Sequence, residues 1–147
     1  MSQAPSDTDI AALAEALRPA ILKVSRRLRQ EAQKVGLSIQ DATLLAHIRK
    51  NPGVGVSALA EAEGTSKPTM SAHIKRLEAE GLIARSDHAE DGRRSGLSIT
   101  VAGARKLDAL RRGRNDWLLQ HLEGLAAADR TALAAAAPAL LRLVDAG

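Results

Sequence analysis

Apolar residues recur at steps of three and four near the N-terminus, which is the spacing of one face of a helix. This face is formed by Ile10, Leu13, Leu17, Ile21, Val24 and Leu28. Pro19 falls inside the stretch, and a proline within a helix costs about 3 kcal/mol or more because it removes a hydrogen bond and clashes with the preceding turn. The pattern therefore predicts helix over residues 10–36, ended by Gly36, either kinked or divided into two helices with the second opening at Pro19.

Cap and breaker residues divide the middle of the chain into three shorter predicted helices. The first is expected to begin after Ser38, which has Asp41 three residues later, and to run to Lys50. The second is expected to begin at Ser57 and to stop at Gly64. The third is expected to begin after Ser66, with Pro68 in its first turn. Asn51-Pro52-Gly53 breaks the chain after the first of them. The second and third helices, joined by a turn that contains glycine, have the pattern of a helix-turn-helix.

A basic, glycine-punctuated segment follows the third helix and reads GLIARSDHAEDGRRSGLSIT from Gly81 to Thr100. Ile83 and Ala84 begin one predicted strand, Leu97 and Ile99 alternate in a second, and Asp91-Gly92 supplies turn chemistry between them. A helix-turn-helix followed by a hairpin with a cationic tip is the layout of a winged helix-turn-helix, in which the hairpin is the wing.

Two further amphipathic helices are predicted after the hairpin. Thr100 has the chemistry of an N-cap for the first, Gly124 and Asp129 bracket the break between them, and a kink is expected at Pro138 in the second. The apolar faces of the helices near both termini offer more surface than the winged helix-turn-helix, roughly 60 residues long, can cover. We therefore expect these faces to pair with a second copy of the chain. The predicted organisation is a disordered lead at 1–9, an N-terminal dimerisation helix at 10–36, a winged helix-turn-helix DNA-binding domain at 38–100 and C-terminal dimerisation helices at 101–147. The expected fold class is thus mainly α with a small β-hairpin wing.

Composition narrows the function. A net charge of +4 and a pI near 10.0 suit an anionic partner, and the absence of cysteine excludes disulfides, thiol redox sensing and cysteine-ligated zinc. One tryptophan, with no phenylalanine or tyrosine, cannot form the stacking platform of a single-strand or RNA-recognition domain, which favours double-stranded DNA. No apolar stretch approaches the roughly 20 residues of a membrane span, and the N-terminus is unlike a secretory signal, so a cytoplasmic location without a membrane partner is expected.

Enzymatic chemistry has little support in the sequence. The chain contains no glycine-rich phosphate loop, no nucleophile elbow and no HExxH motif. Its acidic residues lie in mixed acidic and basic helical surfaces, where solvation explains them, and its four histidines are dispersed. We expect neither an enzyme, nor a cofactor, nor a metal site.

The third of the short helices has a surface suited to a DNA groove. Met70, Ile74 and Leu77 project to one side, and the opposite side is small and polar at its beginning and cationic further on. Small side chains let a helix backbone approach base edges, while lysine and arginine reach phosphates or guanine. The predicted DNA-binding residues are Ser66, Lys67, Pro68, Thr69, Ser71, His73, Lys75 and Arg76 on this helix, and Asp91, Arg93 and Arg94 on the wing. His73 lies between the two faces, so base contact and partial burial are both open for it.

The order of the helices and the string from Asp91 to Thr100, DGRRSGLSIT, resemble the MarR family of bacterial transcription regulators. The segment TSKPTMSAHIKRLEAEGLI is similar to the recognition helix of that family and the strand after it. The resemblance implies a homodimer with intertwined terminal helices, a salt bridge from Asp91 to Arg93 that holds the wing, and arginines at the wing tip that reach the minor groove or its phosphates. It also implies release by a small-molecule effector, but the peroxide-sensing mechanism of some members is excluded because it needs a cysteine.

Three functions remain distinguishable at this point. The leading hypothesis is a sequence-specific, homodimeric transcription regulator, a repressor that leaves a pseudo-palindromic operator when an effector binds. The first alternative is a winged-helix protein-interaction module, which would usually lack the cations that Arg93 and Arg94 supply. The second is a non-specific architectural DNA binder, which would bind all duplexes with similar affinity.

Overall fold

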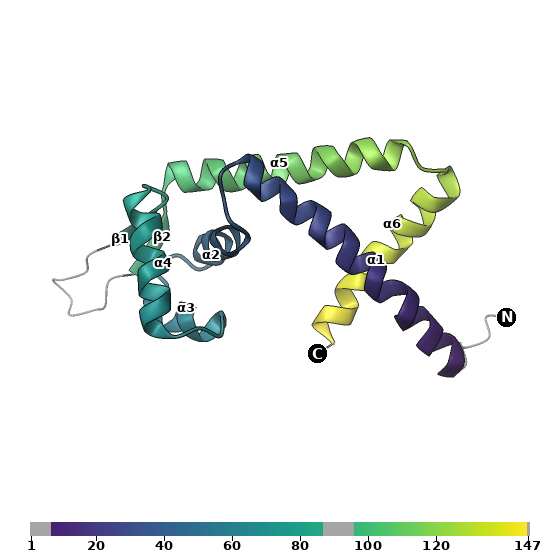
Figure 1. The fold of residues 1–147 in the computed structure, drawn as a ribbon, viewed down its shortest axis with the longest axis horizontal. Helices are drawn as coiled ribbons and strands as arrows, with labels where there is room; N and C mark the ends of the chain where they lie inside the picture. Colours follow the sequence, from purple (N-terminus) through teal and green to yellow (C-terminus); the bar gives the residue numbers. More distant parts are fainter. Residues whose placement is uncertain (1–6, 87–95, 147) are drawn as a thin grey trace. The chain divides into compact units, whose positions relative to one another are not determined.

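The computed structural model describes residues 7–86 and 96–146 and is mainly helical with one small hairpin, as the sequence predicts (Figure 1). The elements in chain order are α1 (Asp7–Lys34), α2 (Ile39–Lys50), α3 (Val56–Ala62), α4 (Lys67–Ala79), β1 (Ile83–Ser86), β2 (Gly96–Ile99), α5 (Val101–Glu123) and α6 (Ala127–Asp145). The chain divides into two compact units, residues 1–111 and residues 112–147. The first unit contains the helix-turn-helix and the hairpin; the second contains the end of α5 and all of α6.

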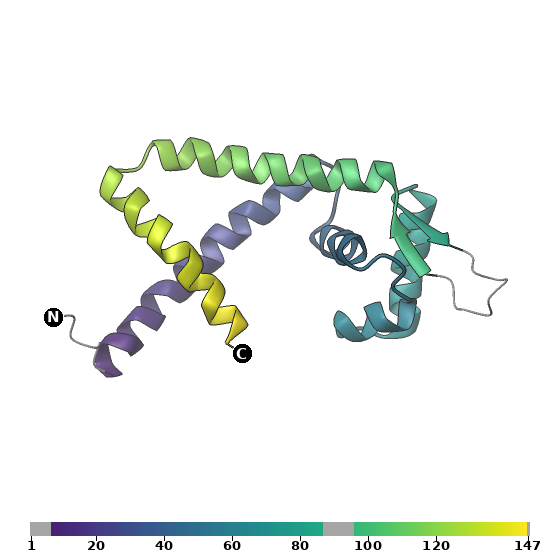
Figure 2. The same ribbon diagram turned by 180° about the vertical axis from the view of Figure 1, so that it is seen from behind.

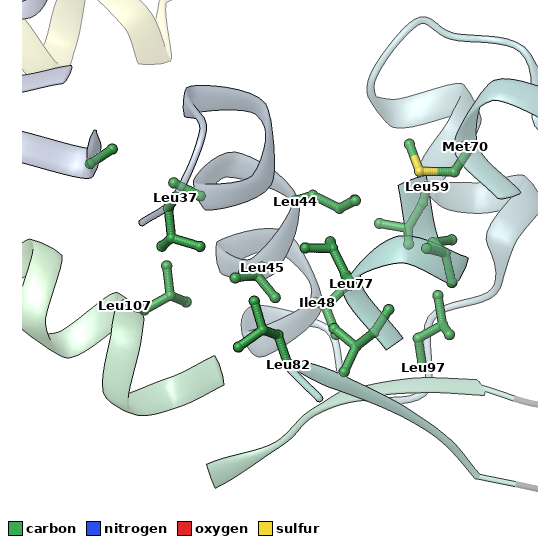
Figure 3. Packing of buried hydrophobic residues seen from close by; sticks show 14 of the residues in the cluster. Leu37, Leu44, Leu45, Ile48, Leu59, Met70, Leu77, Leu82, Leu97 and Leu107 are labelled. Atoms are coloured by element: carbon green, nitrogen blue, oxygen red, sulfur yellow. The ribbon is translucent and has the colours of Figure 1, made fainter. Parts of the chain in front are cut away.

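The core of the first unit is built around α2 and consists of aliphatic side chains and one methionine (Figure 3). The fully buried side chains of this core include Leu45 and Ile48 of α2, Leu59 of α3 and Leu77 of α4. Leu97 of β2 is only 1% exposed. Leu107 at the start of α5 closes the cluster on another side of α2. Because α2 is the common neighbour, it fixes where the helix-turn-helix pair and the hairpin lie.

The N-terminal helix is a single element that passes through Pro19. The prediction that a second helix opens at Pro19 was therefore wrong. Pro19 removes only the hydrogen bond to the carbonyl of Glu15, and both residues are exposed, so water can satisfy that carbonyl. Gly36 ends the helix as predicted, with a positive φ of 73° that lets the Leu37 amide donate back to the Ala32 carbonyl at 3.0 Å.

Local capping chemistry explains the starts of the next helices. The Ser38 hydroxyl accepts from the Asp41 amide at 3.0 Å, which confirms the predicted cap of α2. Helix α3 differs from the prediction, because Gly55 and not Ser57 is its N-cap and makes no side-chain bond. Val54 forms a β-bridge with Leu97, so the chain is extended up to Gly55 and the helix begins directly after it.

The hairpin pairs β1 and β2 antiparallel, with Ile83 opposite Ile99 and Ser86 opposite Gly96. Both strands lie beside α4 (Figures 1 and 2). Thr100 caps α5 as predicted: its hydroxyl accepts from the Gly103 amide at 3.1 Å and donates to the Gly81 carbonyl at 2.7 Å. The end of α4, the hairpin and the start of α5 are thereby tied together.

In the second unit, α6 begins after a break at residues 124–126, near the predicted position, and continues through Pro138 to Asp145 as one element. The Arg130 guanidinium donates to the Leu125 carbonyl at 2.8 Å near the end of α5, and the Trp117 and His121 rings stack with their centroids 4.2 Å apart. None of the helices that the structure describes combines the length and the continuous apolar character that crossing a lipid bilayer demands.

Candidate nucleic-acid interface

The orientation of α4 follows from its apolar stripe. Met70, Ile74 and Leu77 are buried against the core, at the helical spacing that the sequence shows. The opposite side of the helix is exposed and carries Pro68 and Ala72. Burial of one stripe thus leaves the predicted DNA-facing side open to solvent.

The beginning of α4 is organised by two hydroxyl groups. Ser66 is the N-cap: its hydroxyl accepts from the Thr69 amide at 3.3 Å and donates to the Thr69 hydroxyl oxygen at 2.8 Å. Thr69 is exposed, and since its oxygen accepts from Ser66, its own proton is available to an outside acceptor. Pro68 lies in the first turn, as predicted, where its missing amide proton costs no hydrogen bond.

The three cations predicted on α4 differ in their surroundings. Lys67 and Lys75 are exposed, and within the described part of the chain neither ammonium group has an ion-pair partner. Arg76 instead forms a two-pronged ion pair with Asp41 of α2, with its two terminal nitrogens 3.1 and 2.5 Å from the two carboxylate oxygens. One of these nitrogens also lies 3.3 Å from Glu80, one turn further along α4. The structure thus gives Arg76 an internal partner, and its contact with DNA stays a prediction.

Asp41 belongs to this site as well, although the sequence predicts for it only a place in the capped first turn of α2. Its side chain is 8% exposed, so burial by itself raises the pKa of the carboxyl group. Hydrogen bonds from Arg76 and from the Ser38 hydroxyl outweigh that effect and hold the pKa of Asp41 below its ordinary value. The carboxylate is therefore charged at neutral pH. The partners are 35 positions apart in the sequence, and no local pattern pairs them.

The predicted wing residues Asp91, Arg93 and Arg94 lie outside the described residues. The strands that bracket them are described, and the Ser86 hydroxyl donates to the Gly96 carbonyl at 3.2 Å on the last rung. The Arg85 side chain, on β1, lies 3.3 Å from the Glu78 carboxylate of α4 and ties the wing's first strand to the helix.

The remaining predicted residues, Ser71 and His73, are both half-buried on α4. His73 borders a hollow of about 220 Å³ between α2, α4 and the segment that joins α3 to α4, so the structure gives it partial burial at the edge of the exposed face. The hollow is lined by Ile39, Gln40, Thr43, Leu44, Glu63, Thr65, Thr69, Met70 and His73. Among residues 7–86 and 96–146, no cluster of three or more metal-ligating side chains is arranged to hold a metal ion.

Comparison with known proteins places this geometry in a family. Residues 35–94 match the model of the MarR family. An uncharacterised HTH-type transcriptional regulator of Mycobacterium bovis is 33% identical over 139 residues, which are 95% of this chain and 96% of that protein. Its description as a transcriptional regulator agrees with the expectation that the chain is not an enzyme.

Two solved structures show the same fold. A proposed transcriptional regulator of Pseudomonas aeruginosa PA01 superposes with a TM-score of 0.80 at 34% identity, over 95% of this chain and 98% of that one. An S. aureus MepR variant bound to an oligodeoxyribonucleotide has a TM-score of 0.70 at 18% identity, over 90% of this chain and 97% of that one. The chain belongs to the MarR family of winged helix-turn-helix transcriptional regulators.

Proposed function

We propose that this regulator binds double-stranded DNA sequence-specifically, with α4 in the major groove. The observation that carries the proposal is the exposed side of α4, where the small residues Pro68, Thr69 and Ala72 are followed by Lys75, which has no ion-pair partner among the described residues. Such a surface lets the helix approach base edges while the ammonium group reaches a phosphate. The fold shared with the DNA-bound MepR variant supports this placement.

The proposal includes a homodimer. No residue of α6 is buried, and Leu141, Leu143 and Val144 near its end are 67%, 63% and 77% exposed. In α1, apolar side chains such as Leu13 and Leu22 are more than half exposed. Burial of such faces is favourable by about 25 cal/mol per Å², and a two-fold axis would cover the same faces on both copies at once.

Repression released by a small-molecule effector completes the proposal. A dimer bound across a promoter excludes other proteins from the same DNA. The hollow between α2, α4 and the segment that joins α3 to α4 supports the effector step, because its walls include Thr69 and His73, two of the predicted DNA-contacting residues. A ligand in this hollow would touch the DNA-reading helix directly.

Selection of bound sequences from a random duplex library, followed by footprinting upstream of the regulator's own gene, tests the proposal. We expect a pseudo-palindrome with half-sites about 10 bp apart, bound at least about a thousandfold more tightly than unrelated DNA at the same salt concentration. Equal affinity for all duplexes would indicate an architectural binder. No binding to any duplex would indicate a protein-interaction module and contradict the proposal.

A further inference from the structure

A two-pronged ion pair of Arg76 with Asp41 joins α4, the proposed DNA-facing helix, to α2. The planar guanidinium meets both carboxylate oxygens, at 3.1 and 2.5 Å, and the Glu80 carboxylate lies 3.3 Å from the same group. The Asp41 side chain is almost completely buried, whereas the Arg76 side chain is 45% exposed. We refer to Asp41, Arg76 and Glu80 together as the clasp.

The charge of the clasp does not suit a phosphate. Arg76 contributes one positive charge, while Asp41 and Glu80 contribute two negative charges, and the lowered pKa of Asp41 keeps it ionised at neutral pH. A phosphate that approached Arg76 would meet a group of net negative charge, which repels it. Lys75, the neighbouring residue, is exposed and has no carboxylate partner in the part of the chain that the structure describes. Adjacent cations on one helix therefore have different chemistry.

The clasp fixes the orientation of α4 more narrowly than the apolar stripe of the helix can. Hydrophobic contacts such as those of Ile74 and Leu77 are non-directional and leave a helix free to roll or slide slightly on its neighbour. A two-pronged arginine–carboxylate pair fixes both distance and angle. Asp41 lies in the capped first turn of α2, a helix that contributes Leu44, Leu45 and Ile48 to the core. The clasp therefore fixes the rotation of α4 relative to a helix that is itself anchored in the core.

We propose that Arg76 is a positioning residue for sequence reading: with Asp41 it sets the direction in which Thr69 and Ala72 face the DNA, and it does not neutralise a phosphate. This inference rests on the proposed DNA-binding function and refines it. It also replaces the expectation from the sequence that Arg76 contacts DNA itself.

The test compares Arg76→Lys, Arg76→Gln and Asp41→Asn with the control Lys75→Gln. Fluorescence anisotropy gives the affinity of each dimer for the selected operator and for an unrelated duplex over a range of salt concentrations. The slope of the logarithm of the binding constant against the logarithm of the salt concentration counts the phosphates that are neutralised. Circular dichroism and thermal unfolding of the free proteins establish that each variant folds.

Lys75→Gln should lower the slope by about one phosphate per subunit on both duplexes. Arg76→Lys and Arg76→Gln should leave the slope unchanged and reduce the preference for operator over unrelated DNA about tenfold, since a lysine keeps the charge but cannot form the fork. Asp41→Asn should reduce the preference similarly, and the double variant Asp41→Asn/Arg76→Gln should be no worse than either single variant.

The proposal would be overturned if Arg76→Lys kept full operator preference and Arg76→Gln lowered the slope as Lys75→Gln does, because that is the behaviour of a phosphate contact. Thermal unfolding without DNA separates this result from failure of the proposed function. Additive losses of stability for Asp41→Asn and Arg76→Gln would show that the clasp itself is absent. Failure of the wild-type protein to bind any duplex would reject the proposed function, and with it the role of the clasp in reading DNA.

Discussion

A single methyl group at Gly103 tests the junction between the hairpin and α5. A Cβ atom on Gly103 would lie 2.3 Å from the carbonyl oxygen of Leu82 and 2.8 Å from the Cγ1 atom of Ile99, well inside the 3.4 Å at which ordinary contact begins. The Leu82 carbonyl cannot move freely, because it accepts the Thr100 amide at 3.1 Å. Gly103→Ala must therefore displace backbone at the base of the wing.

The expected cost follows from two opposing terms. Overpacking of a buried site costs about 1–3 kcal/mol, while exchange of glycine for alanine in a helix returns about 0.5–1 kcal/mol. The net loss should be roughly 1–2 kcal/mol, which lowers the Tm by about 2–8 °C for a chain of this size. Thermal unfolding followed by far-ultraviolet circular dichroism measures it, at one fixed protein concentration because an oligomer's Tm depends on concentration.

Gly124→Ala is the matched control. The nearest atom to a Cβ at Gly124 is the His121 carbonyl oxygen at 3.5 Å, which is ordinary contact, so its Tm should stay close to that of the wild type. If Gly103→Ala were as stable as Gly124→Ala, the close approach of α5 to the end of the α4–β1 connection would be refuted.

Three further predictions concern acid stability, assembly and base reading. The pKa values of Asp41 and Glu31 are held below their ordinary values of 3.8 and 4.5. The folded state therefore binds fewer protons than the unfolded state in that pH range. The contribution of these two groups to the free energy of unfolding should be fully present above about pH 5 and should be lost as the pH falls through their folded pKa values. Urea unfolding between pH 3 and 7 should show a flatter acid limb in Asp41→Asn than in the wild type, and an equally steep limb would contradict the clasp. Leu141→Glu should either dissociate the proposed dimer, as measured by sedimentation velocity, or unfold the protein. The control Ala132→Glu on the same helix should sediment as the wild type does. An intact, folded dimer of Leu141→Glu would exclude this face of α6 from the dimer interface. Thr69→Val should change the selected operator sequence by about 1–3 kcal/mol of preference at one position, and an unchanged motif would show that the hydroxyl reads no base.

Features that depend on neighbouring residues could be predicted from the sequence. The Ser38, Ser66 and Thr100 caps are all present, because a hydroxyl three residues before an amide needs no distant partner to bond it. The end of α1 at Gly36 follows in the same way from the left-handed conformation that glycine adopts easily. The order of these helices resembles that of the MarR family, and this resemblance predicts how they are arranged in the whole fold.

Features that depend on distant residues could not be predicted. The start of α3 at Gly55 is set by the bridge of Val54 to Leu97, which is 43 positions further along the chain. The partner of Arg76 lies on another helix, and helical periodicity places Arg76 on the exposed side without showing where its long side chain bends. A flexible arginine on an exposed face has many possible partners, and only the assembled core selects one.

The division of cations into free and paired groups leads to a last quantitative prediction. The chain has 21 lysine and arginine residues in total. Within the predicted DNA-binding domain, residues 38–100, the described ion pairs engage Arg49, Arg76 and Arg85. On α4 this leaves Lys67 and Lys75 to neutralise phosphates, and the sequence adds Arg93 and Arg94 of the wing. About four phosphates per subunit, or eight per dimer, correspond to a salt slope of about −7, and Arg93→Ala should reduce its magnitude by about 2 per dimer. Anisotropy titrations from low to moderate salt measure both values. A wild-type slope of about −4, the value for Lys67 and Lys75 alone in both subunits, would show that the wing does not reach the DNA backbone. A slope unaffected by Arg93→Ala would place the neutralising cations elsewhere in the DNA-binding domain.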